Sequence, residues 1–287
     1  MEDKSLAKQG AILLATYSRP DELEMCLKSL TNQLARVEPV IVVIFQRGNL
    51  QVQRVLEKFR ADIHYIFETD ALGTSPLENI NFNRILGYEL CFEYLKFDWV
   101  LAVEEDIVIS NDSFEFCNEA MTKYWENRLF RGVNLGSYEK MNVADKPTYS
   151  LISYGLHGQA SAITKPTWDR LPKNTLRKSA RIDGFDGQVE NLLKIGFFVT
   201  SNSSRYLDYG WNGTHASRDK HDNYYQRLRE SWAGDVSVLP DKYLHMQVTH
   251  NWRADAVKYG FHSVTKSIVR NILFNIKRKL GIIMKTN

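Results

Sequence analysis

The chain has 287 residues, enough for about two domains or one large α/β unit with a substantial core. Its composition, 44% hydrophobic, 12% aromatic and 25% charged residues, is that of a folded globular protein and excludes a mainly disordered chain. Thirty-seven basic and 34 acidic residues give a net charge of +3. This charge is too small for a dedicated nucleic-acid-binding protein, so no nucleic-acid partner is expected.

The first half of the chain predicts a regular alternation of strands and helices. Short apolar runs predict the strands, and apolar residues spaced three and four apart predict the helices. In chain order the predicted elements are strand 11–16, helix 18–34, strand 40–45, helix 52–59, strand 63–67, helix 77–94 and strand 99–103. Fully apolar strands alternating with helices predict an α/β fold, a parallel sheet with helices on both faces.

From about residue 126 the regular alternation ends, and glycines and aromatic residues gather in irregular stretches. This part predicts a smaller subdomain that shapes the substrate site over residues 126–260, sharing one core with residues 1–125. The three cysteines fall in predicted helices, lack metal-ligand spacing and cannot all pair, so they are interpreted as reduced core thiols. They are Cys26, Cys91 and Cys117.

The end of the chain is basic. Residues 262–287 hold six basic and no acidic residues, so the rest of the chain carries a net charge of −3. Apolar residues in steps of three and four predict an amphipathic helix over residues 261–287. Such a helix can lie on an anionic membrane surface or pack on the protein body, and both alternatives remain open. The start of the chain predicts no signal peptide, and no window has the ~18 apolar residues of a membrane span. We therefore expect a cytoplasmic protein, peripheral on the inner face of the membrane if the tail binds lipid.

Two predicted strand ends carry polar side chains. Thr-Tyr-Ser-Arg at 16–19 follows the first strand, and Glu-Glu-Asp at 104–106 follows the fourth. Ligands of parallel sheets bind at the carboxyl ends of the strands. Three adjacent carboxylates repel one another, and a divalent cation on a diphosphate is a fitting counter-charge; a solvated acidic turn is the alternative. Alternation along an extended chain predicts Glu104 and Asp106 on one side and Glu105 on the other.

Three stretches around these strands resemble a known enzyme family. Residues 15–30, 40–49 and 97–116 (ATYSRPDELEMCLKSL, VIVVIFQRGN and FDWVLAVEEDIVISNDSFEF) resemble the nucleotide-sugar-binding half of GT-A glycosyltransferases. The closest likeness is to the inverting N-acetylglucosaminyltransferases that start hybrid and complex N-glycan branches, and to related bacterial family-2-like transferases. The resemblance implies a GT-A fold, with a nucleotide-sugar-binding half at 1–125 and an acceptor-binding and catalytic half at 126–260.

The resemblance also implies roles for single residues. Asp106 would hold Mn²⁺ or Mg²⁺ on the donor diphosphate, Glu104 would face the nucleoside and Arg19 would contact the donor. The other donor-binding positions of these two strand ends are Thr16, Tyr17 and Glu105. The family often has an acid near the end of strand two that reads uracil, and this chain has Gln46 there instead. Gln46 can still form hydrogen bonds with the edge of a pyrimidine, so a UDP-sugar is the expected donor. The missing acid makes the preference for UDP over other nucleotides weaker.

The second half carries the remaining candidates. An inverting transfer needs a carboxylate that accepts the proton of the acceptor hydroxyl. Family spacing, counted back from residues 196–201, implies Asp186 as this base and Asp183 as the second choice; the alternative for Asp186 is a helix cap. The family's approach to the diphosphate implies His215 as a metal ligand, although a structural histidine is the alternative. Residues 155–171 resemble the segment that closes over donor and acceptor, or form a tight turn into a helix ending in a core tryptophan.

The sequence thus predicts an inverting, metal-dependent glycosyltransferase that moves a hexose or N-acetylhexosamine from a nucleotide diphosphate sugar to a glycan hydroxyl. The acceptor is expected to be a glycan or lipid-linked glycan in bacterial capsule, lipopolysaccharide or exopolysaccharide synthesis. One alternative is a sugar-nucleotide pyrophosphorylase, which normally has a glycine-rich loop after strand one, where residues 15–20 contain no glycine. The other is a non-catalytic glycan-binding protein of the same fold.

Overall fold

The first half alternates strands and helices in the predicted order. The structure, a computed structural model, describes residues 8–33, 37–136, 149–152, 156, 158–180, 185, 196–201 and 204–210. The strands of the first half are β1 (Gly10–Thr16), β2 (Val40–Gln46), β3 (Tyr65–Thr69) and β4 (Trp99–Glu104). They are connected by α1 (Pro20–Thr31), α3 (Leu50–Lys58), and α4 (Pro76–Glu89) with its π-helical continuation η1 (Leu90–Tyr94).

These four strands are parallel and bring their carboxyl ends to one edge. The order is β3-β2-β1-β4. Thr16 of β1 is paired with Phe45 of β2, and Ala15 of β1 with Glu104 of β4. The two polar strand ends that the sequence singled out therefore lie side by side.

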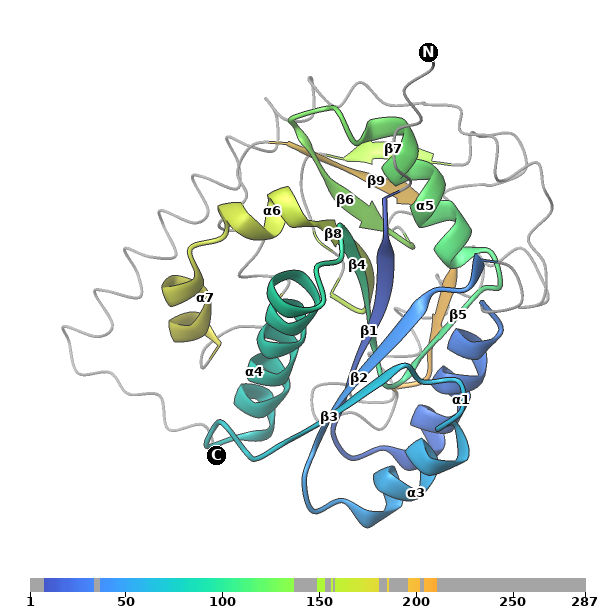
Figure 1. Cartoon of the computed structure of the whole chain (residues 1–287), viewed down its shortest axis with the longest axis vertical. Coiled ribbons are helices and arrows are strands. Elements are labelled where there is room, and N and C mark those ends of the chain that lie inside the picture. Colours follow the sequence, from blue (N-terminus) through green and yellow to red (C-terminus); the bar gives the residue numbers. More distant parts are fainter. Residues whose placement is uncertain are drawn as a thin grey trace, which may run out of the picture.

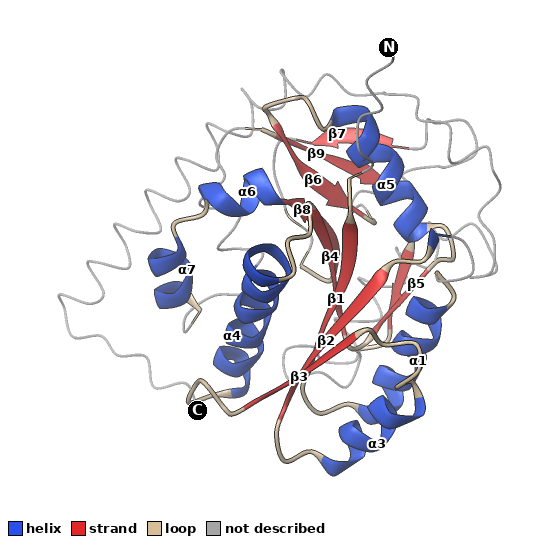
Figure 2. Cartoon of the chain, viewed as in Figure 1, coloured by secondary structure: helices blue, strands red, loops and turns tan. Residues whose placement is uncertain are grey.

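The second half extends the same sheet. Its elements are β5 (Ile107–Ile109), α5 (Ser113–Tyr124), β6 (Phe130–Asn134), β7 (Tyr149–Ile152), β8 (Ala160–Thr164), α6 (Lys165–Arg170), α7 (Lys173–Ser179), β9 (Phe197–Ser201) and β10 (Tyr206–Asp208). The eight-stranded order is β3-β2-β1-β4-β8-β6-β9-β7, and β5 pairs with β10 in a separate antiparallel ribbon. Figures 1 and 2 show this large sheet with helices on either side. The α/β fold with both faces covered is confirmed.

The parallel strands predicted for the first half are confirmed, and the second half adds β8, which runs antiparallel to both β4 and β6. One expectation for the second half is wrong. Residues 160–164 do not close over a site, since they form this buried central strand. The alternative for the following residues is confirmed: Trp168 of α6 is fully buried. The boundary near residue 125 stays a prediction, although strands from both sides of it share one sheet.

Helices cover the two faces with separate apolar cores. One core contains side chains of α1, α3 and α5, and the other those of α4, η1, α6 and α7 (Figure 1). Cys26 and Cys117 lie in the first and Cys91 in the second, and all three are free thiols. The prediction of reduced core cysteines in helices is therefore confirmed.

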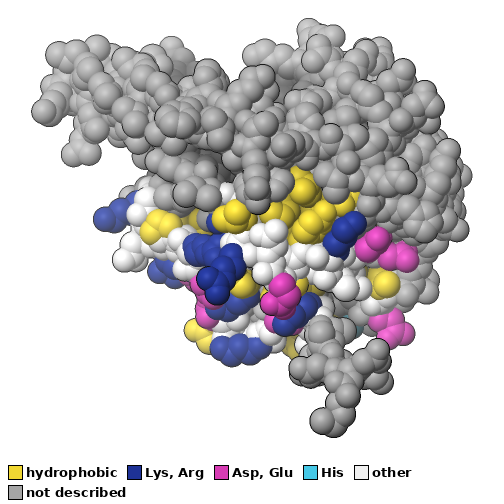
Figure 3. Space-filling model, turned by 90° about the horizontal axis from the view of Figure 1, so that it is seen from above, with side chains coloured by type: hydrophobic (Ala, Val, Ile, Leu, Met, Phe, Trp, Pro, Cys, Tyr) yellow, Lys and Arg dark blue, Asp and Glu magenta, His cyan; other side chains and the backbone are white. Residues whose placement is uncertain are grey.

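The surface of the described residues mixes charges. On the face seen in Figure 3, basic and acidic side chains lie among one another, with apolar side chains between them. None of the helices within the described ranges has the length and apolar character to cross a bilayer. The tail helix predicted over 261–287 lies outside these ranges, so its two alternatives stay open.

Candidate active site

Glu105 holds the loop that follows β1. Its Oε2 accepts hydrogen bonds from Thr16 Oγ1 at 2.6 Å and Tyr17 N at 2.7 Å, and its Oε1 accepts from Ser18 N at 3.4 Å. The side chains of Thr16 and Glu105 are thus bonded to each other and shape the loop before α1. Their predicted contact with a donor stays a prediction.

Asp106 lies in a buried, strongly acidic position. It forms an ion pair with Arg19, the residue just before α1, and the Asp106 side chain is only 12% exposed. Burial, followed by the carboxylates of Glu104 and Asp208, raises the pKa of Asp106 to about 8 despite the opposing effect of Arg19. A carboxylate in this setting favours an added positive charge.

Asp208 is a further carboxylate near Asp106, and no sequence motif predicted it. A Cβ added to Gly210 would lie 2.2 Å from Asp106 Oδ2 and 3.0 Å from Asp208 Oδ1, so both oxygens approach one point beside the glycine. The ribbon of β5 and β10 creates this approach, with Asp208 opposite Ile107. The only local signal in the sequence is an acid at the end of a short apolar strand, two residues before a glycine.

Asp208 is held in place from two sides. Gln159 Nε2 donates to Asp208 Oδ2 at 2.6 Å, and Gly210 N donates to Asp208 Oδ1 at 2.6 Å. Gln159 Oε1 in turn accepts from the hydroxyl of Tyr206 at 2.9 Å. Gln159 directly precedes β8, so the second half of the chain orients a carboxylate toward the acidic turn of the first half.

Glu104 has a different partner. Its Oε1 accepts from Arg84 Nη1 of α4 at 2.9 Å, whereas Asp106 pairs with Arg19, just before α1. The Glu104 carboxylate is nevertheless, after burial, the largest cause of the raised pKa of Asp106. The predicted shared side of Glu104 and Asp106 stays a prediction. The predicted contact of Glu104 with the nucleoside stays a prediction.

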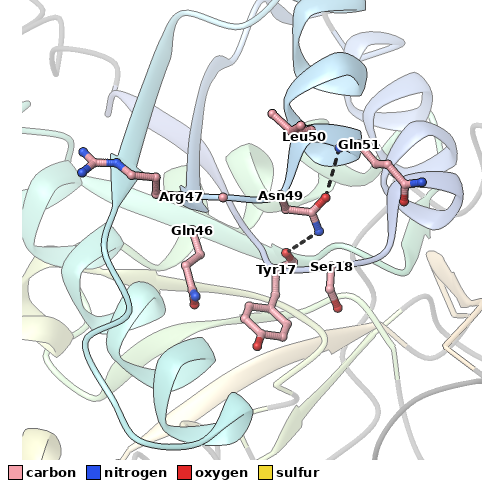
Figure 4. A pocket seen from close by; sticks show the side chains of 8 residues that line it. Tyr17, Ser18, Gln46, Arg47, Asn49, Leu50 and Gln51 are labelled. Carbon is pink, nitrogen blue, oxygen red and sulfur yellow. Dashed lines mark hydrogen bonds between the residues drawn. The ribbon is translucent and has the colours of Figure 1, made fainter.

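A cavity of about 480 Å³ opens where β1 and β2 end. It is lined by residues 17–18 and 46–51, and in Figure 4 the side chains of Tyr17 and Gln46 extend toward the same space. Asn49 Nδ2 donates to the carbonyl of Tyr17 at 3.3 Å, which joins the two strand ends. This volume lies within the usual range of sites for small organic ligands.

Gln46, which lines this cavity, carries a buried side-chain oxygen without a hydrogen-bond partner among the described residues. Its Oε1 is buried and accepts no hydrogen bond from the described residues. Leaving a buried acceptor without a donor costs free energy, so a ligand N–H would stabilise this position. The neighbouring Arg47 extends away from Gln46 (Figure 4) and pairs with Glu68 and Asp70.

No family model and no curated protein matches this sequence. Solved structures show a weak likeness, and three of them are the following. S. aureus TarS 1–349 in complex with UDP is 12% identical, with a TM-score of 0.48 over 78% of this chain and 70% of that one. Mannosyltransferase PcManGT from Pyrobaculum calidifontis, in complex with GDP-Man and Mn²⁺, is 12% identical, with a TM-score of 0.48 over 98% and 82%. S. aureus TarS is 13% identical, with a TM-score of 0.45 over 69% and 36%.

The described residues suit a divalent cation only in part. They contain no group of three or more histidine, cysteine or acidic side chains that could hold a metal ion. The carboxylates of Asp106 and Asp208 nevertheless both lie close beside Gly210. Mg²⁺ and Mn²⁺ typically take one or two protein carboxylates and complete their coordination with water and phosphate oxygens. The pair therefore fits a cation that arrives with a diphosphate.

The remaining predicted site residues lie outside the described ranges. These are the two candidates for the base, Asp183 and Asp186, and the predicted metal ligand His215. Phe185, between the two acids in sequence, is described and is 2% exposed. The predicted roles of the three residues stay predictions.

Proposed function

We propose that this protein is an inverting, metal-dependent glycosyltransferase whose donor is a nucleotide diphosphate sugar, most simply a UDP-sugar. The observation that carries the proposal is the placement of Asp106, Asp208 and Arg19 beside the cavity of Tyr17 and Gln46. A nucleotide sugar has a base, a diphosphate and a leaving group whose charge must be neutralised. The adjoining cavity and charged cluster offer a place for each.

The cavity would bind the nucleoside. Gln46 Oε1 would accept an N–H of the base, and the aromatic ring of Tyr17 offers a face for the base or ribose. The diphosphate would then lie toward Asp106. When bound there, a divalent cation would stabilise the developing charge of the leaving diphosphate.

Arg19 connects donor binding to Asp106. In the structure its guanidinium pairs with Asp106. With a cation on Asp106, the guanidinium would instead pair with phosphate oxygens, which it can bind in a bidentate manner. The buried side chain of Asp106 would therefore have a positive partner both with and without the cation.

The acceptor side completes the proposal. We assign the base to Asp186, with Asp183 as the second choice, and the transferred group to a hexose or N-acetylhexosamine. The base would accept the proton of the acceptor hydroxyl as its oxygen attacks the anomeric carbon. We further propose a glycan or lipid-linked glycan acceptor in bacterial surface polysaccharide synthesis, with the enzyme in the cytoplasm. The basic tail supports contact with an anionic membrane.

A hydrolysis panel tests the function. The purified chain is incubated with UDP-, GDP-, CDP- and ADP-sugars, with Mn²⁺ or with EDTA, and release of the nucleoside diphosphate is measured. We expect slow release from one class of donor, best from UDP-sugars, and none in EDTA. A non-catalytic glycan-binding protein would release nothing, and a pyrophosphorylase would need pyrophosphate and form a nucleoside triphosphate. Either result would contradict the proposal.

Replacing Arg19 by glutamine is expected to change two affinities in opposite directions. Binding of Mn²⁺ alone should become tighter, because the competing guanidinium is gone. Binding of UDP in the presence of Mn²⁺ should weaken by about tenfold, because a charge-assisted phosphate contact is lost. Electron paramagnetic resonance of Mn²⁺ and calorimetry with UDP measure the two effects.

Arg54→Gln is the matched control, since Arg54 is an exposed arginine of α3 that does not line the cavity. It should leave both affinities nearly unchanged. Weaker binding of Mn²⁺ to Arg19→Gln would contradict the exchange of partners at Asp106.

A further inference from the structure

Gln159, the residue directly before β8, bridges two side chains of β10. Its Nε2 donates to Asp208 Oδ2 at 2.6 Å, and its Oε1 accepts from the hydroxyl of Tyr206 at 2.9 Å. Tyr206 and Asp208 are two positions apart on β10, so their side chains lie on the same side of the strand. One amide therefore contacts both of them.

The direction of these hydrogen bonds fixes the orientation of the amide. An ionised carboxylate can only accept hydrogen bonds, so the NH₂ group of Gln159 must face Asp208 and its oxygen must face Tyr206. The Tyr206 side chain is fully buried, and its hydroxyl acts as the donor to that oxygen. A flipped amide would place an oxygen against the carboxylate and lose both bonds. The Tyr206 hydroxyl thus keeps the NH₂ group of Gln159 on Asp208.

The main chain ties the same region to the acidic turn at residues 104–106. Glu104 N donates to Gln159 O at 3.0 Å, and Tyr209 N donates to Asp106 O at 2.8 Å. Gln159 therefore bonds the turn through its main chain and Asp208 through its side chain. Any shift of Gln159 would move Asp208 relative to Asp106.

The two oxygens of the Asp208 carboxylate have different surroundings. Gln159 binds Oδ2, whereas Oδ1 accepts from Gly210 N at 2.6 Å and lies on the side where Asp106 Oδ2 also approaches Gly210. The carboxylate cannot rotate without breaking one of these bonds. In metal sites, side chains that hydrogen-bond a ligand in this way hold it in the orientation that the ion requires.

We propose that Gln159 is a positioning residue for the cation, holding Asp208 in the orientation in which it and Asp106 bind the same ion. This inference rests on the proposed function. Gln159 acts through Asp208, because the NH₂ group that faces this carboxylate has no lone pair to offer a metal ion. Loss of Gln159 should therefore weaken the binding of Mn²⁺, and the effect should depend on Asp208.

The test replaces Gln159 by methionine, which has a similar length but no amide donor. Binding of Mn²⁺ to the full chain in the presence of UDP is measured by electron paramagnetic resonance, and thermal unfolding in EDTA shows that each variant is folded. We expect the Kd for Mn²⁺ to rise by about tenfold or more, as when a side chain that orients a metal ligand is lost. Tyr206→Phe removes only the hydroxyl, and it should raise the same Kd by about threefold.

A double variant tests whether the effect depends on Asp208. In an Asp208→Asn background, Gln159→Met should cause no further rise of the Kd for Mn²⁺, because two residues that act as one unit are not additive. The matched control is Gln33→Met. Gln33 is a fully buried glutamine bonded through both ends of its amide, to Ser110 O and Phe114 N, beyond β5 of the same ribbon. General loosening of the ribbon would affect this variant too, whereas we expect its Kd to stay within about threefold of wild type.

The outcomes distinguish the two claims. A wild-type Kd for Mn²⁺ in folded Gln159→Met and Tyr206→Phe would overturn the role of Gln159 and leave the proposed function intact. A further tenfold rise in the Asp208→Asn background, or an equal rise in Gln33→Met, would overturn it as well. If the wild-type protein binds no Mn²⁺ in the presence of UDP, the proposed function fails, and this inference fails with it.

Discussion

Asp106→Asn is expected to lower Mn²⁺-dependent release of the nucleoside diphosphate by at least about 100-fold, because a neutral amide is a poor ligand for a hard cation and loss of that cation removes several kcal/mol of transition-state stabilisation. The same substitution should make the metal-free protein more stable at pH 8. The raised pKa of Asp106, about 8 against an ordinary value of 3.8, means that the fold favours the uncharged form of this side chain. Function and stability are therefore expected to move in opposite directions.

The sign of the pH dependence follows from that pKa. In wild type the contribution of Asp106 to stability is fully present below about pH 4 and is lost as the pH rises through about 8. Asparagine has no such loss, so its advantage in thermal unfolding with EDTA should grow from pH 5 to pH 8. Asp169→Asn, at an exposed acid of α6, is the control and should show no such growth. An Asp106→Asn protein with wild-type hydrolysis, or with the pH dependence of wild type, would contradict this account.

Arg205→Leu is expected to lower the free energy of unfolding by about 3–5 kcal/mol, the usual effect of leaving one member of a buried ion pair alone. Arg205 Nε donates to Asp112 Oδ2 at 3.2 Å, and the two side chains are 0% and 2% exposed. The guanidinium also lies 4.0 Å from the ring centre of Phe116 and donates to the hydroxyl of Ser201. Arg205 directly precedes β10, so this pair anchors the strand that carries Asp208.

The double variant Arg205→Leu/Asp112→Asn provides the control for this second prediction. It removes both charges, so it should be more stable than Arg205→Leu alone, as measured by urea unfolding. If Arg205→Leu alone costs less than about 1 kcal/mol, the pair does not hold the ribbon in place. An equal loss in the single and double variants would show that packing, and not charge, is responsible.

The strands and helices of the first half could be predicted because their signals are local. The apolar runs at 11–16, 40–45 and 99–103 fall within β1, β2 and β4, and each end differs by one residue at most. The direction of β8 could not be predicted in this way. All five of its residues are buried, but two of them carry hydroxyl groups, so no apolar run predicted a strand at 160–164, let alone its direction.

The site was predictable only where it is contiguous in sequence. The acidic turn and the loop at 16–19 follow adjacent parallel strands, and the general rule for such sheets brings them together. Asp208 and Arg84 reach the same region through long-range contacts, a ribbon pairing in one case and a buried polar helix face in the other. Periodicity reports apolar faces, so it gave no sign that α4 buries Asn81, Asn83 and Arg84.

Anomalous scattering of Mn²⁺ in crystals grown with Mn²⁺ and UDP locates the metal directly. We expect one strong manganese peak within about 2.5 Å of a carboxylate oxygen of Asp106, the distance expected of a coordinating oxygen. The diphosphate should complete the coordination, the uracil should lie beside Gln46, and Arg19 should have moved to the phosphates. UDP bound elsewhere, or UDP bound with no manganese at Asp106 and with the Arg19 ion pair intact, would contradict this expectation.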